Sequence, residues 1–401
     1  MSVKNNQGGC FPTSEQELLL QAALLKGEDA IAAWHQWKTN VDFDSIDAGS
    51  HRLLPLVYRN LSNHGVQSDP LLVKMKEIYK RTWFKNTLLF NQILPILHSL
   101  QAAGIDLLLL KGSALTIEYY KDYGLRPMAD FDILIRLADV PKTINLLKQL
   151  GWSSEPIKLP QGLSVVHSLD FKDKSGKSID LHWHVLAEGL TENADDDFWN
   201  NAILTKFKDL SIFTLNPTDN LLHVCVHGAR WNPVPPIRWV SDAMIIINSC
   251  QDTINWEYLL IQAQKRRLVL PLKNTLNLLH DLLNAPVPLS ILQRLETSCV
   301  SAVEKQEYHV MTRKKLPVFG SLIVRYLQYL RSIDSKKISF NILGFLKHLS
   351  AVWSVDNLGQ FGLILIGKFI RRIGIDIFSS QPHRKAEKFA PKELGRQITD
   401  K

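Results

Sequence analysis

The spacing of hydrophobic residues divides the chain into two helical flanks and a central stretch of strands. From residue 14 to residue 103 apolar residues recur at the period of a helix, as Leu72, Met75 and Ile78 do. The first helix is predicted to begin at Ser14, because Glu17 follows three residues later in the pattern of a capping box. Helical patterning returns at residue 216 and continues to about residue 380.

Residues 104–215 have a different pattern, in which short apolar or alternating runs predict strands. The turn Lys174-Ser175-Gly176 joins two of these runs into a hairpin. The predicted strands are 105–110, 131–136, 164–173, 177–185 and 211–215, with helices at 114–121 and 139–150. The order predicts a small mixed sheet with helices packed on it.

The predicted fold class is therefore α+β, a small mixed β-sheet domain flanked by N-terminal and C-terminal helical regions. The predicted segments are a helical region at 1–103, the sheet domain at 104–215, a helical domain at 216–380 and a polar tail at 381–401. The acidic run Asp195-Asp196-Asp197 is predicted to be solvated or to cap a helix with the sequence FWNNAIL.

Composition narrows the class of protein. Hydrophobic residues make up 45% of the chain and charged residues 21%, which is usual for a globular protein. The four cysteines lie far apart without the spacing of a zinc site or a disulfide framework. The polar start lacks the apolar core of a signal peptide, and no run of about 18 apolar residues occurs. We therefore expect a cytoplasmic protein with no transmembrane segment.

The net charge of +8 is distributed unevenly. Residues 301–401 contain 18 Lys and Arg against 8 Asp and Glu, which leaves a charge of −2 on the first 300 residues. The basic character belongs to the C-terminal quarter and not to the stretch that carries the candidate site. Nucleic acid is therefore kept as an alternative partner but is not favoured.

The strongest chemical feature is the pair Asp130 and Asp132 at the start of the strand 131–136. Residues i and i+2 of a strand point to the same side, so two carboxylates are presented together. A divalent cation relieves their repulsion, and Mg²⁺ prefers oxygen ligands. Asp180 reaches the same place if its strand lies beside the first. Three carboxylates can hold two metal ions, so two Mg²⁺ ions are predicted.

The segment Lys111-Gly112-Ser113 joins a predicted strand to a predicted helix. Such a turn offers backbone N–H groups and a helix N-terminus to an anion. Gly112 allows close approach of a phosphate, and the Ser113 hydroxyl can donate to a phosphate oxygen. Lys111 and Arg126 are candidates to neutralise phosphate charge.

This ordered set, Gly112-Ser113, Asp130-x-Asp132 and a later Asp180, resembles the polymerase-β-like nucleotidyltransferase superfamily. The stretch LLLLKGSALTIEYYKDYGLRPMADFDILIRLADVPKTINLLKQLGW is similar to the bacterial uncharacterised nucleotidyltransferase family, with its KG-x-A/S-L, R-P-M-x-D-x-D and later I-D-L-H-W segments. The resemblance covers residues 100–185 and, more loosely, 223–242. It implies that the three aspartates are catalytic and bind metal, and that nucleotide phosphates lie near Gly112 and Ser113.

Other residues are candidates for the substrate side of the site. His182 and His184 share a strand face with Asp180, where the alternative is an ordinary hydrogen bond within the sheet. A predicted helix face is a second candidate to line the cleft, with packing between helices and salt bridging as the alternative. Its residues are His223, His227, Arg230, Arg238 and Asp242.

The predicted function is Mg²⁺-dependent transfer of a nucleoside monophosphate from an NTP donor to an acceptor hydroxyl on a small molecule or protein. One alternative is a catalytically silent binding or scaffold protein of the same fold. Another is an enzyme that adds nucleotides to an RNA end.

Overall fold

The computed structural model describes residues 9–352 except 67, 156, 158, 160, 233–234, 314–319 and 334–341. The chain divides into two compact units, Met1–Ser354 and Val355–Lys401, and every described residue lies in the first. The predicted boundaries after residues 103 and 215 fall inside this first unit and stay predictions. The predicted tail, 381–401, lies outside the described residues.

The N-terminal region is helical, as predicted. The first helix is capped by Thr13, whose side chain accepts from the backbone N–H of Gln16, while the Gln16 side chain bonds back to Thr13. The capping box therefore begins one residue earlier than predicted from Ser14 and Glu17, because Thr13 is the residue with extended backbone. The helices are α1 (Ser14–Leu24), α2 (Gly27–Asn40), α3 (Ala48–His51), α4 (Leu54–Asn63) and α5 (Pro70–Ala102).

A seven-stranded mixed sheet follows, in the order β3-β4-β5-β2-β1-β7-β6. Strands β1 and β7 pair in parallel, as do β2 and β5, whereas the other neighbours are antiparallel. This confirms the α+β class and the mixed sheet. The strands are β1 (Leu108–Leu109), β2 (Phe131–Leu134), β3 (Ser153–Ser154), β4 (Ser168–Lys172), β5 (Ser178–His182), β6 (Ile203–Phe207) and β7 (Leu210–Thr214).

Two strands were not predicted. Strand β3 is only two residues long, and β6 contains the residues Ile203 and Leu204 that the sequence placed at the end of a helix. Strand β6 is an edge strand that buries only Phe207, so it has no alternating pattern of burial. Its turn to β7 uses Lys208 with a positive φ of 55° in place of a glycine, which removes the usual hairpin signal.

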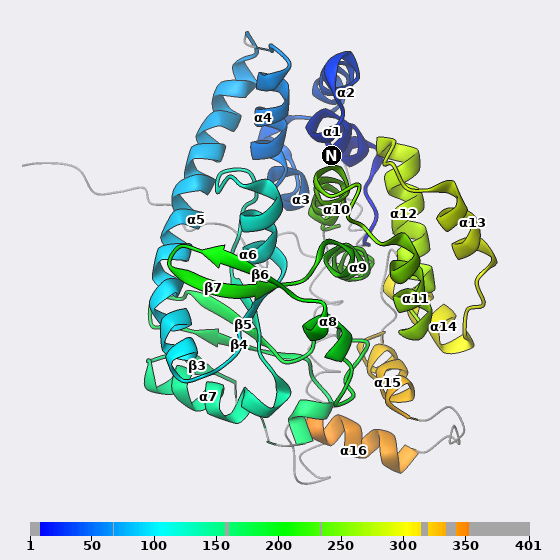
Figure 1. Cartoon of the computed structure of the whole chain (residues 1–401). Helices are drawn as coiled ribbons and strands as arrows, with labels where there is room; N and C mark the ends of the chain where they lie inside the picture. The colour runs from blue at the N-terminus through cyan, green and yellow to red at the C-terminus, as the bar shows by residue number, and fades with distance from the viewer. Residues whose placement is uncertain are drawn as a thin grey trace, which may run out of the picture. The chain divides into compact units, whose positions relative to one another are not determined.

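One face of the sheet packs against α5 and α7 (Val140–Gln149), as Figure 1 shows. Phe90 and Leu97 of α5 contact this face, where Phe131 and Ile133 of β2 are fully buried. Short helices α6 (Lys111–Leu115) and α8 (Asp196–Asn200) follow β1 and β5 in the chain. A π-helical turn, Thr116–Tyr120, extends α6.

The opposite face belongs to a second hydrophobic core, which joins Leu108 and Leu134 of the sheet to Leu221 and Val240. In Figure 1, helices α9 and α10 lie between the sheet and the group α11–α14. The C-terminal helices are α9 (Pro217–Gly228), α10 (Arg238–Ser249), α11 (Trp256–Lys265), α12 (Val269–Leu283), α13 (Leu289–Thr297), α14 (Ala302–Met311), α15 (Gly320–Ser332) and α16 (Ile342–Val352).

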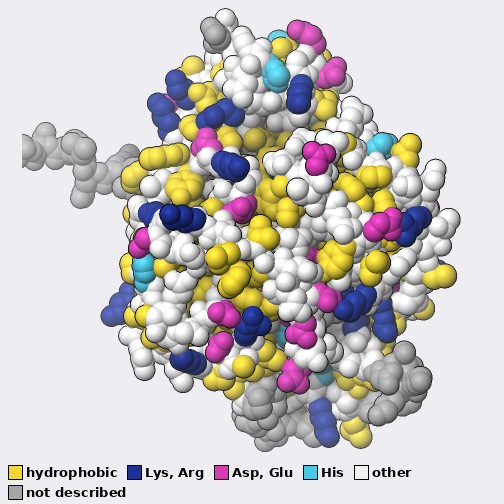
Figure 2. All heavy atoms as spheres, viewed as in Figure 1, with side chains coloured by type: hydrophobic (Ala, Val, Ile, Leu, Met, Phe, Trp, Pro, Cys, Tyr) yellow, Lys and Arg dark blue, Asp and Glu magenta, His cyan; other side chains and the backbone are white. Residues whose placement is uncertain are grey.

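The surface shown in Figure 2 carries Lys and Arg side chains interspersed with Asp and Glu. Among the described helices, none combines the length and the apolar composition that crossing a membrane requires.

Candidate active site

The carboxylates of Asp132 and Asp180 are brought together by the register of two strands. Strands β2 and β5 are parallel neighbours, and Asp132 stands directly opposite Asp180. Phe131 and Ile179 alternate with them and are fully buried in the core on the other face. The strand period of two therefore places both acids on the side of α6, α9 and α10. The condition set for Asp180, that its strand lie beside that of Asp132, is met.

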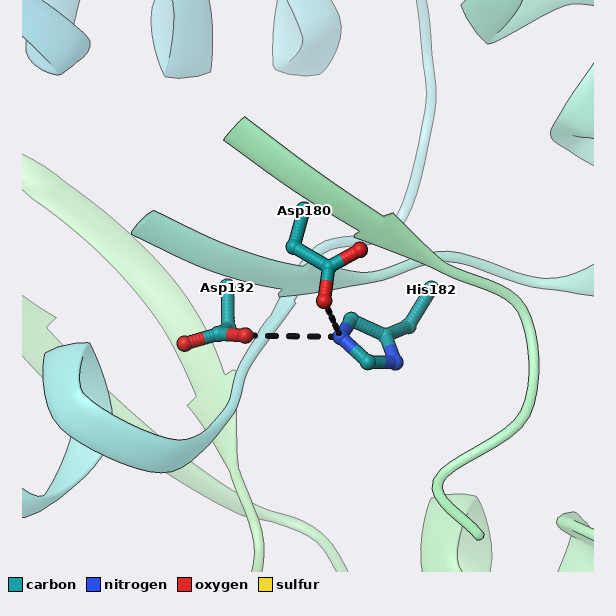
Figure 3. A group of neighbouring side chains, drawn as sticks. All are labelled: Asp132, Asp180 and His182. Carbon is teal, nitrogen blue, oxygen red and sulfur yellow. Dashed lines mark ion pairs between the residues drawn. The ribbon is translucent and has the colours of Figure 1, made fainter. Parts of the chain in front are cut away.

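His182, two residues beyond Asp180 on β5, completes a compact group. One ligand atom each from Asp132, Asp180 and His182 lie within 4.8 Å of one another. The His182 Nε2 atom is 2.8 Å from Oδ2 of Asp180 and 3.4 Å from Oδ1 of Asp132, as Figure 3 shows. Among the described residues this is the group of acids and histidines that could hold a metal ion.

The ammonium of Lys111 lies inside this group. Its Nζ atom is 2.8 Å from Oδ1 of Asp132, 3.2 Å from Oδ2 of Asp180 and 3.1 Å from Nε2 of His182. Lys111 begins α6 directly after β1 and has a φ of +45°, in the left-handed region that residues other than glycine rarely adopt. The sequence predicted a phosphate contact for Lys111, and the structure shows it bound to the acids.

The charges of the group are mutually stabilised. Burial raises the pKa of Asp132, but Lys111 and His182 outweigh it and hold the pKa below its usual range. Burial also raises the pKa of Asp180, but the hydrogen bond from His182 and the charge of Lys111 outweigh it and hold this pKa well below its usual range. Burial and Lys111 oppose protonation of His182, yet its bonds to both carboxylates raise its pKa. The group thus holds two ionised carboxylates beside the Lys111 ammonium.

A cavity of about 450 Å³ opens beside the group, within the size range of small-ligand sites. Lys111, Asp130 and Asp132 line it from the sheet side. Asp130 lies in the bend before β2 and is not part of the three-residue group. The enclosing walls and the charge of Asp132 raise the pKa of Asp130. The predicted pair of acids therefore faces one cavity, but the two carboxylates have different surroundings.

The remaining predicted phosphate ligands are engaged with the protein. The Ser113 hydroxyl is fully buried and lies 2.7 Å from the Leu110 carbonyl and 3.1 Å from that of Asp132. Arg126 is buried and forms two 2.8 Å bonds to the carboxylate of Asp242. A Cβ added to Gly112 would lie 2.5 Å from Nη1 of Arg126, so this glycine makes room for the ion pair. Gly112 and Arg126 also line the cavity.

The predicted helix face does line the cavity, with different partners for each side chain. Arg230 is bonded to Glu188, at 2.6 Å and 2.8 Å from its two carboxylate oxygens. Arg238 donates to the Pro127 carbonyl at 2.6 Å. Burial and the nearby cation Lys111 hold the pKa of His223 well below its usual range, which keeps this imidazole neutral. His227 is exposed to the cavity, and the cavity walls together with Lys111 and Arg230 lower its pKa as well. His223, His227, Arg230 and Arg238 line the same cavity as Asp132, whereas their partners Glu188 and Pro127 do not.

His184 does not line this cavity. It is buried, and its Nδ1 atom is 2.6 Å from Oδ2 of Asp195. The second oxygen of Asp195 accepts from the backbone N–H of Val185 at 2.9 Å. The prediction that the acidic run is solvated is therefore wrong for Asp195, which binds and orients the end of β5. Asp195 does stand at the N-cap position of α8, but its side chain makes no capping bond.

Sequence reasoning missed Arg52, which follows α3 and lines the cavity. Nothing near it in the chain marks it as functional, because it meets the cavity only through the packing of α3 near Pro235. The burial of His182 among the acids could have been expected more firmly, since it occupies the i+2 position from Asp180 on the same face of β5.

A mixed sheet that presents two carboxylates beside a Gly-Ser helix start is the arrangement that the resemblance to nucleotidyltransferases implies. The profile of the family described as uncharacterised nucleotidyltransferase matches residues 48–284, more than half of the chain, and the protein belongs to this family. The comparison with curated proteins found no match. The protein is accordingly a nucleotidyltransferase, an enzyme that transfers nucleotidyl groups.

Proposed function

We propose that the protein transfers a nucleoside monophosphate from an NTP to an acceptor hydroxyl on a small molecule or protein, with release of pyrophosphate. The observation that carries this proposal is the placement of Asp180 directly opposite Asp132, whose carboxylate lines a ligand-sized cavity. The α-phosphate of the donor would lie at this wall, where the acceptor oxygen would form its bond to the α-phosphorus opposite the bond that breaks to release pyrophosphate.

The donor set suits a divalent cation. Two carboxylates and one imidazole converge, and carboxylates are the ligands that Mg²⁺ and Mn²⁺ favour. Asp132 and Asp180 would hold the first of two Mg²⁺ ions, and Asp130 would contribute to the second. When bound, such ions neutralise charge on the transferring phosphoryl group. The low pKa values of Asp132 and Asp180 keep both residues in the ionised form that binds cations.

The cationic residues of the cavity separate into two groups. Lys111, Arg126 and Arg230 are paired with carboxylates. Arg238 is bonded to the Pro127 carbonyl, and neither it nor Arg52 has a carboxylate partner within the described part of the chain. Burial and, to a smaller extent, the charge of Arg126 lower the pKa of Arg238 to about 10, because both disfavour its positive charge. An anionic ligand beside Arg238 would stabilise that charge. These two arginines are proposed to contact the β- and γ-phosphates of the donor.

Replacing Arg238 by glutamine is expected to weaken binding of each metal–NTP complex by about tenfold or more, the usual effect of losing a hydrogen bond to a charged group. The double variant R52Q/R238Q should bind more weakly still. Calorimetric titration with the four NTPs in turn measures this. Arg136→Gln, an exposed arginine paired with Asp106, is the control and should bind as the wild type does. Unchanged affinity in the double variant would remove both arginines from the donor site.

The scaffold alternative has one observation in its favour, because the Lys111 ammonium lies where a cation would bind. Calorimetry with each NTP and Mg²⁺ distinguishes it: a wild-type protein that binds none of them is the scaffold. Addition of nucleotides to an RNA end predicts RNA binding that weakens steeply with salt. RNA binding that is absent or independent of salt would remove that alternative.

A further inference from the structure

Lys111 occupies a position that a bound metal ion would need. Its Nζ atom contacts Oδ1 of Asp132 and Oδ2 of Asp180, the same oxygens that converge on His182. An ammonium and a divalent cation cannot share these oxygens at close range, because two positive charges would then lie within a few ångströms of each other. Either Lys111 excludes the metal, or it leaves when the metal binds.

The surroundings of Lys111 allow it to leave. Its side chain is 21% exposed and lines the 450 Å³ cavity, so open space adjoins the ammonium. A lysine carries a point charge on a flexible four-carbon stem and can reorient without a fixed geometry. Arg126, in contrast, is buried and bonded to both oxygens of Asp242. Among the cavity's paired cations, Lys111 is therefore suited to exchange partners.

We propose that Lys111 is a displaceable counter-ion, which holds Asp132 and Asp180 together until a divalent cation binds and then swings into the cavity to contact the donor phosphates. This inference rests on the proposed function, since it needs a metal and a polyphosphate at this site. Charge balance supports it: the incoming cation replaces the ammonium beside the carboxylates, and the ammonium moves toward the negatively charged polyphosphate. The left-handed backbone of Lys111 is the kind of local strain that proteins retain at functional sites.

Displacement has a thermodynamic signature that a purely structural lysine would lack. If Lys111 competes with the metal, removing its charge must strengthen metal binding in the absence of any nucleotide. If the released ammonium contacts phosphate, removing its charge must weaken polyphosphate binding in the presence of metal. The two effects have opposite signs, whereas loss of a structural contact would weaken both.

The test uses Lys111→Met, which keeps the length of the side chain and removes its charge. Titration of the full-length protein with Mn²⁺ should show a dissociation constant about tenfold lower than that of the wild type, within the usual range of coupling between ligands. Titration with inorganic tripolyphosphate in saturating Mn²⁺ should show a dissociation constant about tenfold higher. Tripolyphosphate makes the result independent of base preference.

Lys121→Met is the matched control. Lys121 also has a left-handed backbone, with a φ of 52°, but it is exposed and lies outside the cavity lining. Both constants should be unchanged in this variant. Mn²⁺ binding that is unchanged or weaker in the Lys111→Met protein overturns the inference, and if the wild type binds Mn²⁺ the proposed function survives that result. Absence of Mn²⁺ binding in both proteins overturns the inference and the proposed metal site together.

A second measurement avoids substitution and so does not depend on the variant folding. Amine-reactive labelling of the wild-type protein, resolved by mass spectrometry, reports the accessibility of the Lys111 amine. Labelling of Lys111 should increase when Mn²⁺ is added and decrease again when tripolyphosphate follows, while labelling of Lys121 stays constant. A Lys111 amine that Mn²⁺ leaves equally or less reactive contradicts displacement.

Discussion

Replacing Asp132 or Asp180 by asparagine is expected to reduce nucleotidyl transfer by about a hundredfold or more, because metal stabilisation of the transition state is worth several kcal/mol. The amide retains the size of the side chain and can still accept a bond from Lys111, so the fold should persist. The assay is incubation of the protein with Mg²⁺, cell extract as the source of acceptor, and NTPs labelled at the α-phosphate.

Asp170→Asn provides the matched control for this experiment. Asp170 stands opposite Asp180 in the register of β4 and β5, but its side chain is exposed and is 3.4 Å from Lys172. Its removal should leave labelling close to the wild-type level. Circular dichroism and thermal unfolding establish that each variant is folded. Full labelling by a folded D132N/D180N protein would refute the proposed function.

Replacing Arg126 by alanine is expected to lower the free energy of unfolding by about 3–5 kcal/mol, because it leaves the buried carboxylate of Asp242 without its cation. Arg126 and Asp242 are both nearly inaccessible, and their two 2.8 Å bonds join the segment before β2 to α10. The Tyr120 hydroxyl, which donates to Asp242 at 2.7 Å, cannot replace the lost charge. Urea unfolding followed by fluorescence measures the change.

An exposed ion pair supplies the comparison. Arg294 and Glu257 form a salt bridge whose side chains are 49% and 62% exposed, and Arg294→Ala should leave the free energy of unfolding close to that of the wild type. The double variant R126M/D242L removes both buried charges and should recover much of the loss. If R126A is no less stable than R294A, the buried pair is not what fixes α10 against the sheet.

The parts of the site that depend on strand periodicity could be predicted from the sequence. Asp130 and Asp132 flank a core phenylalanine, and Asp180 alternates with Ile179 and Leu181 in the same way. Such alternation determines which face of a strand each side chain occupies. The predicted sheet then brought Asp132 and Asp180 together, because strands of one small sheet have few neighbours to choose from.

The partners of the cationic residues could not be predicted, because they depend on contacts between distant segments. Arg126 meets Asp242 across 116 residues of chain. Lys111 contacts the acids because the chain turns sharply at its left-handed backbone. This conformation is rare for lysine, so the sequence offers no reason to expect it. Edge strand β6 was missed for a related reason, since a mostly exposed strand does not show the alternation of burial on which prediction depends.

The position of β1 in the sheet has a consequence for synthesis of the chain on the ribosome. Strand β1 pairs with β7 in parallel, so Leu108 and Leu109 cannot pair with Phe213 and Thr214 until about a hundred more residues have been synthesised. The pairing of Asp132 with Asp180 involves a much shorter separation. A nascent chain can thus bring Asp132 and Asp180 together while β1 still lacks its neighbour β7. Until β7 emerges, that unpaired apolar edge is a point where neighbouring chains could add a strand and aggregate.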